Sequence, residues 1–151
     1  LRQRPDGARA LGRVLEIGTG CGYQAALLDR LARQVYSVER LKPLFDKARE
    51  NLAEIRSDRL RLIYGDGRLG HPPNAPYDGI IAAAGGEDIP AAWLDQLALC
   101  GRLVAPCQVG GSGDQRLVVI DRLADGSLRR SEFEAVRFVP LQSGVNDPGV
   151  A

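Results

Sequence analysis

The chain has 151 residues, enough for one domain with a single buried core. Its 20 basic and 19 acidic residues give a net charge of +1, which argues against a broad basic surface for nucleic acid or for an anionic membrane. Three cysteines without a Cys-x-x-Cys spacing and one histidine argue against a disulfide framework and a zinc site, so we expect a cytoplasmic protein without a metal.

The chain starts with Leu1 and contains no methionine, so we expect it to be part of a longer protein that lacks an N-terminal segment. Residues 1–12 are basic and rich in turn formers, which predicts a lead-in loop. We expect residues 1–151 to form one partial domain. No apolar run reaches the roughly 18 residues that a membrane span requires.

The first half of the chain alternates strand and helix patterns. An apolar run predicts a strand at 13–17, and leucine and alanine at helical spacing predict a helix at 23–33. We expect Ala26, Leu27, Leu31 and Ala32 to lie on one side of this helix. Strands rich in valine, isoleucine and tyrosine are predicted at 34–39 and 59–64, with a helix between them that starts near Pro43.

The second half adds a proline-rich loop, a buried strand, a helix, a strand and a closing hairpin. The expected ranges are 70–76, 77–84, 89–99, 102–106, and 115–123 with 131–139. Alternating strands and helices predict an α/β protein with a Rossmann-like, doubly wound and mostly parallel sheet. The hairpin would add antiparallel strands at its C-terminal edge.

Three features follow the first three predicted strands. Gly18, Gly20 and Gly22 let the backbone approach a ligand closely before a helix begins. Glu39, at the end of the second strand, can accept hydrogen bonds from both hydroxyls of a ribose. Asp66 after the third can read an adenine edge. Each feature also has a plain explanation, such as a tight turn or a solvent-facing carboxylate, but together they favour a ligand that contains adenosine.

A dinucleotide and S-adenosylmethionine both contain adenosine. The dinucleotide fingerprint is Gly-x-Gly-x-x-Gly, but this chain has Tyr23 at the third glycine position. Glu16 beside the loop would repel a pyrophosphate and attract an ammonium group. S-adenosylmethionine is therefore the better interpretation.

Five segments carry a resemblance to a known family: VLEIGTGCGYQ at 14–24, VYSVER at 35–40, GDG at 65–67, YDGII at 77–81 and EAVRFVPL at 134–141. With them the chain resembles class I S-adenosylmethionine-dependent methyltransferases. More narrowly, it resembles the protein-L-isoaspartate (D-aspartate) O-methyltransferases, over residues 14–141 or so.

The resemblance implies transfer of a methyl group from S-adenosylmethionine to the α-carboxylate of isoaspartyl residues in damaged proteins, with S-adenosylhomocysteine as product. It implies cofactor contacts from Glu16, Gly18, Thr19, Gly20, Gly22, Tyr23, Gln24, Glu39, Arg40, Asp66 and Gly67. It implies substrate contacts from Ala83, Arg137, Phe138 and Val139. The partners would be isoaspartyl peptides and proteins, with no nucleic acid or membrane, and we expect a monomer.

No catalytic residue is assigned. A carboxylate substrate is already ionised at neutral pH, so the reaction requires no general base. The serine usually credited to the family lies in an N-terminal segment that has no counterpart here. The family also usually has Thr-Ala where this chain has Ala83 and Ala84. Two alternatives stay open: a class I methyltransferase that acts on a small molecule, and an inactive cofactor-binding fragment.

Overall fold

The structure is a computed structural model that describes residue 1 and residues 11–149. The lead-in loop expected at 1–12 lies mostly outside the described residues, and the first strand begins at Leu11, two residues earlier than predicted.

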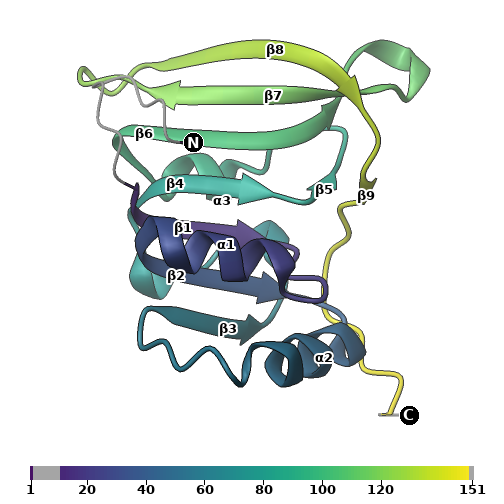
Figure 1. Ribbon diagram of the computed structural model, residues 1–151. Helices are drawn as coiled ribbons and strands as arrows, with labels where there is room; N and C mark the ends of the chain where they lie inside the picture. Colours follow the sequence, from purple (N-terminus) through teal and green to yellow (C-terminus); the bar gives the residue numbers. More distant parts are fainter. Residues whose placement is uncertain (2–10, 150–151) are drawn as a thin grey trace.

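A seven-stranded sheet forms the centre of the molecule, in the order β3-β2-β1-β4-β6-β7-β8 (Figure 1). Its strands are β1 (Leu11–Ile17), β2 (Ala32–Glu39), β3 (Leu60–Tyr64), β4 (Tyr77–Ala82), β6 (Leu97–Gln108), β7 (Gln115–Arg122) and β8 (Leu128–Val136). The first five strands are parallel to their neighbours, whereas β7 and β8 are antiparallel at the edge. The predicted fold class and the closing hairpin are therefore confirmed.

Strand β1 lies at the point where the strand order reverses. Its Val14 pairs with Val35 of β2 on one side and with Gly79 of β4 on the other. The carboxyl ends of β1, β2, β3 and β4 consequently meet at one edge of the sheet, which is where ligands bind in open α/β sheets.

Two helices cover one face of the sheet and a short helix lies on the other (Figure 1). They are α1 (Tyr23–Leu31) and α2 (Lys42–Leu52) on the first face and α3 (Ala91–Asp95) on the second, with 3-10 turns at Gly67–Leu69, Pro72–Asn74 and Gly110–Ser112. The larger core cluster includes Trp93 of α3 and Tyr77 of β4, both almost fully buried.

The apolar side predicted for the first helix faces the core only in part: Ala26 packs against a core cluster, and Ala32 is buried as the first residue of β2. Ala25 and Leu28 are the buried apolar residues of α1, whereas Leu27 and Leu31 are each 46% exposed. Apolar residues occur on every side of this short helix, so the sequence does not determine which side faces the sheet. Leu28 packs against Val14 in the second core cluster.

The helix predicted at 89–99 is also too long. Helix α3 ends at Asp95, and the apolar run that follows belongs to β6, where Leu97 pairs with Tyr77. A short apolar run has no periodicity that separates a buried strand from a helix. The backbone departs from regular pairing around Cys100, whose φ is +61°.

Two predicted strands end earlier than expected. The strand predicted at 77–84 stops at Ala82, and Ala84–Gly85 forms the separate strand β5, which pairs with β9 (Val139–Pro140). Strand β8 likewise ends at Val136 rather than at residue 139, and begins at Leu128 rather than at residue 131. The loop predicted at 70–76 contains the 3-10 turn Pro72–Asn74.

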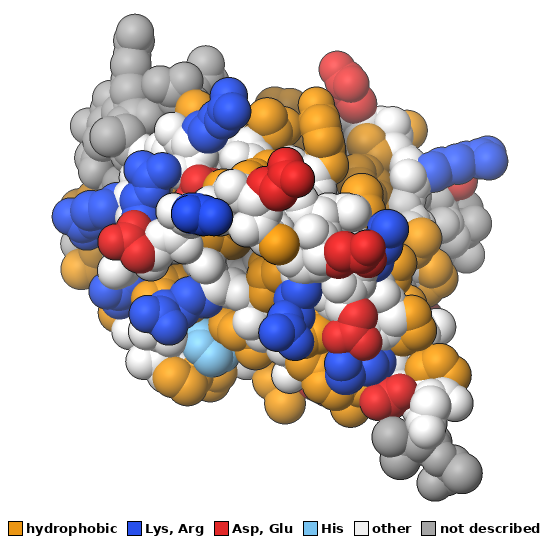
Figure 2. Space-filling view, turned by 60° about the horizontal axis from the view of Figure 1, so that its bottom comes forward, with side chains coloured by type: hydrophobic (Ala, Val, Ile, Leu, Met, Phe, Trp, Pro, Cys, Tyr) orange, Lys and Arg blue, Asp and Glu red, His pale blue; other side chains and the backbone are white. Residues whose placement is uncertain are grey.

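The surface seen in Figure 2 has basic and acidic side chains mixed together, without a continuous patch of one sign, in keeping with the net charge of +1. Within residues 1 and 11–149, no helix is long and apolar enough to cross a membrane.

Candidate functional site

The glycine loop joins β1 to α1 at the carboxyl edge of the sheet. It is held against β2 by its backbone, because the N–H groups of Gly18 and Thr19 both donate to the carbonyl of Val38, at 2.9 and 3.3 Å. The hydroxyls of Thr19 and Ser37 add a buried hydrogen bond of 2.6 Å. The loop is thus fixed before any ligand enters.

Gly20 and Gly22 both have positive φ, but they serve different purposes. A Cβ at Gly22 (φ +96°) would lie 2.9 Å from Cδ1 of Leu52, so this glycine lets α1 pack closely on α2. A Cβ at Gly20 (φ +57°) would meet no atom within 4 Å. Gly20 therefore borders open space, the arrangement that lets a ligand approach the backbone.

Glu39 ends β2 beside the loop. Its Oε1 accepts a hydrogen bond from the N–H of Gly20 at 2.9 Å, and its Oε2 accepts one from the N–H of Leu41 at 3.0 Å. A carboxylate offers about four lone-pair positions, so each oxygen can still accept a hydrogen bond from a ligand hydroxyl. The side chain is held in place while keeping the acceptor capacity that ribose recognition requires.

Glu16 lies beneath the loop rather than in a pocket wall, and it is fully buried. Its Oε1 accepts from the Ser37 hydroxyl at 2.5 Å, and its Oε2 accepts from the Gln24 amide at 2.8 Å. Burial raises the pKa of Glu16 to about 7, although both hydrogen bonds lower it and the charge of Glu39 raises it further. Glu16 and Gln24 therefore support the loop from below.

Asp66 and Arg40 both bond to the C-terminal segment. Oδ1 of Asp66 accepts from the N–H of Arg68 at 2.9 Å and starts the 3-10 turn, and its Oδ2 accepts from the N–H of Gly144 at 2.8 Å. The Arg40 guanidinium donates to Gln142 and to two backbone carbonyls of the same segment.

A pocket of about 420 Å³ lies between the loop and the C-terminal segment. Its lining residues are Ile17, Gly18, Gly20, Val38, Glu39, Arg40, Leu41, Leu44, Gly67, Ala83, Ala84, Val139, Pro140, Leu141 and Gln142. The volume falls within the 300–1,000 Å³ usual for cofactor pockets. The open space at Gly20, the carboxylate of Glu39 and the apolar walls fit an adenosine-containing cofactor.

The predicted cofactor residues divide into two groups. Gly18, Gly20, Glu39, Arg40 and Gly67 line the pocket. The rest lie outside its lining, namely Glu16, Thr19, Gly22, Tyr23, Gln24 and Asp66. Tyr23 is 74% exposed on α1 and has no place in the pocket wall.

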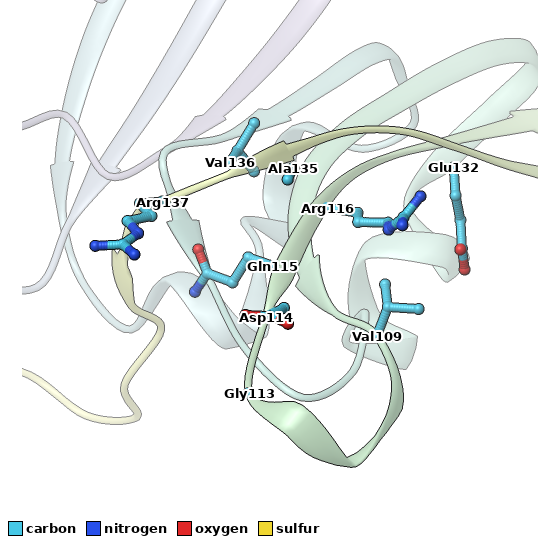
Figure 3. A pocket seen from close by; sticks show the side chains of 9 residues that line it. All are labelled: Val109, Gly113, Asp114, Gln115, Arg116, Glu132, Ala135, Val136 and Arg137. Atoms are coloured by element: carbon cyan, nitrogen blue, oxygen red, sulfur yellow. The ribbon is translucent and has the colours of Figure 1, made fainter.

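Of the predicted substrate residues, Ala83 and Val139 line the same pocket. Arg137 instead borders a larger open cleft of about 970 Å³ between the 109–114 turn, β7 and β8. In Figure 3, Arg116 and Glu132 lie on one side of this cleft and Arg137 on the other. The residue between the two cavities, Phe138, is 42% exposed, and its N–H donates to Gln115 at 2.8 Å.

Sequence reasoning missed the apolar walls of the pocket, above all Leu41, Leu44 and Leu141. Pairing of β9 with β5 brings Leu141 to the pocket, and this contact joins segments more than fifty residues apart. One feature of the sequence could have indicated that the C-terminal segment contributes to the pocket. It is the motif at 134–141, which ends just before Gln142.

Comparison with known proteins gives consistent results. A sequence model of the family described as protein-L-isoaspartate(D-aspartate) O-methyltransferase matches residues 8–146. A protein-L-isoaspartate O-methyltransferase of Leptothrix cholodnii is 71% identical over 147 residues, which are 97% of this chain and 52% of the relative. One of Methylibium petroleiphilum is 68% identical over 146 residues, 97% of this chain and 54% of that protein.

Among solved structures, a protein-L-isoaspartate O-methyltransferase aligns with a TM-score of 0.79 and 30% identity, covering 88% of this chain and 43% of the other. A Plasmodium falciparum structure, described as a complex with S-adenosyl-L-homocysteine, shares the fold with a TM-score of 0.71 and 22% identity over 86% of this chain and 65% of that one. The chain spans about half the length of the curated relatives it matches.

Proposed function

Because the chain belongs to the protein-L-isoaspartate(D-aspartate) O-methyltransferase family, we propose that it binds S-adenosylmethionine and methylates isoaspartyl residues of damaged proteins. The observation that supports this most is the pocket at the carboxyl edge of the sheet, where Gly20 borders open space beside the Glu39 carboxylate.

Different pocket residues would contact the ribose, the adenine and the methionine part of the cofactor. Glu39 would accept hydrogen bonds from the ribose hydroxyls, and Leu41, Leu44 and Leu141 would enclose the adenine between apolar side chains. The glycine loop would lie against the methionine part. When bound, S-adenosylmethionine supplies an electrophilic methyl group on a sulfonium.

The contribution of the chain to the reaction is orientation and exclusion of water. The α-carboxylate of an isoaspartyl residue is ionised at neutral pH and needs no base to activate it. Holding the carboxylate in line with the methyl group can lower the activation barrier by roughly 7–11 kcal/mol. No catalytic side chain is assigned.

The peptide would lie in the larger cleft, with its carboxylate at the Ala83 and Val139 end of the pocket. Val139 lines the pocket and Arg137, two residues earlier, lines the cleft, so the two cavities approach each other along this segment. Phe138 lies between them. Arg137 is the basic residue of this segment and would pair with a carboxylate of the peptide.

We further propose that the enzyme acts as a monomer in the cytoplasm. The sequence has three cysteines, an odd number without a Cys-x-x-Cys spacing, and this fits a reducing compartment.

The test is methyl transfer by the full-length protein to an isoaspartyl peptide and to its aspartyl twin. We expect label from S-adenosylmethionine in the isoaspartyl peptide alone. Equal labelling of both peptides, or binding of S-adenosylhomocysteine without labelling of either, would contradict the proposal. Labelling of a small-molecule panel instead would identify another class of methyltransferase.

A further inference from the structure

The C-terminal segment crosses the cofactor pocket as a strap, which we define as residues 139–146. In Figure 1 the chain leaves β8, passes β9 and runs along the carboxyl ends of β4, β1 and β2 towards α2. Val139, Pro140, Leu141 and Gln142 of the strap line the pocket. The strap therefore forms one wall of the cavity.

The first end of the strap is attached through its backbone. Val139 pairs with Ala84 and Pro140 with Gly85, and the N–H of Leu141 donates to the carbonyl of Gly85 at 2.8 Å. Gly85 is buried, so water has little access to compete for this attachment.

The second end is attached at Arg40, and its contacts are exposed. The Nε and Nη2 atoms of Arg40 donate to the carbonyls of Gly144 and Ser143, at 3.1 and 3.4 Å, and Nη1 donates to Oε1 of Gln142 at 3.0 Å. The backbone carbonyl of Arg40 accepts from the N–H of Asn146 at 2.7 Å. One residue thus makes four contacts with the strap.

Two further contacts complete this second attachment. The N–H of Gly144 donates to Asp66 at 2.8 Å, and the N–H of Lys42 donates to the carbonyl of Asn146 at 2.8 Å. Exposed hydrogen bonds open at lower free energy than buried ones, so the Arg40 end should release before the β5–β9 end.

Resting on the proposed function, we propose that Arg40 is a positioning residue that latches the strap over the pocket. Cofactor exchange then proceeds by release of the Arg40 end while the β5–β9 pairing persists. Arg40 lines the pocket, but all three of its guanidinium nitrogens donate to the strap, so the guanidinium acts on the cofactor through the strap.

The first measurement is amide hydrogen exchange in the full-length protein without cofactor. In Arg40→Gln, exchange at Gly144 and Asn146 should speed up by about tenfold, while the amide of Leu141 stays protected. Arg40→Lys should recover part of the protection, since an ammonium can still donate to one of the carbonyls. Unchanged exchange at Gly144, or equal acceleration at Leu141, would overturn the latch.

The second measurement is the kinetics of S-adenosylhomocysteine binding by stopped flow. A latch limits entry and exit alike, so both the association and the dissociation rate should rise by about tenfold in Arg40→Gln, with a much smaller change in Kd. A rise in the dissociation rate alone would show that Arg40 contacts the cofactor directly and would overturn the proposal.

Two further variants separate the possible causes of a change. Gln142→Ala removes one acceptor of the latch and leaves Arg40 intact, so it should give smaller changes in the same direction. Arg59→Gln removes an arginine that bonds to Asp29 at 3.5 Å, away from the strap, and should change neither measurement. If the unchanged protein fails to bind S-adenosylhomocysteine, the proposed function fails, while hydrogen exchange still decides whether Arg40 holds the strap.

Discussion

Oε1 of Glu39 accepts a hydrogen bond of 2.9 Å from the backbone N–H of Gly20, so the acidic residue of β2 and the glycine loop of β1 form one unit. The same carboxylate lines the pocket. A change at Glu39 should therefore alter both the loop and the ligand contact.

We expect Glu39→Ala to weaken S-adenosylhomocysteine binding by about 1.5–3 kcal/mol, the usual size for hydrogen bonds to a charged group. Isothermal titration calorimetry measures this directly. Glu50→Ala, on the exposed side of α2, is the matched control and should leave the affinity unchanged. Equal affinities for the two variants would mean that Glu39 does not bind the ligand.

Gly20→Ala tests the open space in the loop. The added methyl group meets no protein atom within 4 Å, so the cost to folding should be the left-handed backbone alone, about 1–2 kcal/mol. Cofactor affinity should fall much further, because the methyl group projects from a residue that lines the pocket.

The control is Gly126→Ala in the β7–β8 turn. Gly126 also has a positive φ, +87°, and open space around it, so it carries the same backbone cost. We expect both variants to melt at a similar temperature and only Gly20→Ala to lose affinity for S-adenosylhomocysteine. Parallel loss of affinity in both would trace the effect to stability instead.

The raised pKa of Glu16 predicts how the unfolding free energy depends on pH. Its pKa rises from 4.5 to about 7 on folding, so the native state binds the proton more tightly than the unfolded chain. The unfolding free energy should therefore decrease as the pH rises from about 4.5 to about 7, by about 3 kcal/mol for this group.

Glu16→Gln removes the titration and keeps the side-chain volume. Chemical denaturation of both proteins at pH 5 and pH 8 gives the comparison. The original chain should lose more stability than the variant between these two values. Identical pH dependence would show that Glu16 stays ionised throughout.

Much of this arrangement could be predicted from the sequence, because its determinants are local. The loop that contains Gly20 follows an apolar strand directly, and Glu39 ends the next strand, so their meeting at one sheet edge follows from parallel pairing alone. The sequence did not indicate which of these side chains lie in the pocket and which are buried beneath the loop, however. Glu16 directly precedes Ile17, which lines the pocket, but alternation along β1 turns the Glu16 side chain to the opposite face of the sheet, beneath the loop.

The contribution of the strap could not be derived in the same way. Leu141 reaches the pocket through its contact with Gly85, and Gly144 is held by Asp66; both partners lie far away in the sequence. Nothing in the periodicity of residues 139–146 indicates such contacts. The length of α3 was overestimated for a related reason, because Leu97 is placed in β6 by pairing with Tyr77.

Trp93 provides a test of how the opposite face of the sheet supports the site. Its buried indole N–H donates to the carbonyl of Gly67 at 2.8 Å, and Gly67 lines the pocket. Trp93→Phe removes this bond and leaves the N–H of Gly70, at 3.0 Å, as the donor to that carbonyl, which should lower the unfolding free energy by about 0.5–1.5 kcal/mol. Because the 3-10 turn at Gly67 would be less firmly held, S-adenosylhomocysteine binding should weaken as well.

Tyr77→Phe is the comparison for this last prediction. It removes another hydrogen bond of the same core cluster, from the Tyr77 hydroxyl to the carbonyl of His71 at 2.5 Å, away from the pocket. Denaturation should show that both variants are destabilised, and calorimetry should show that only Trp93→Phe binds the ligand less tightly. Should Tyr77→Phe weaken binding to the same degree, the effect would arise from general loosening of the core, and the bond from Trp93 to Gly67 would have no specific part in shaping the pocket.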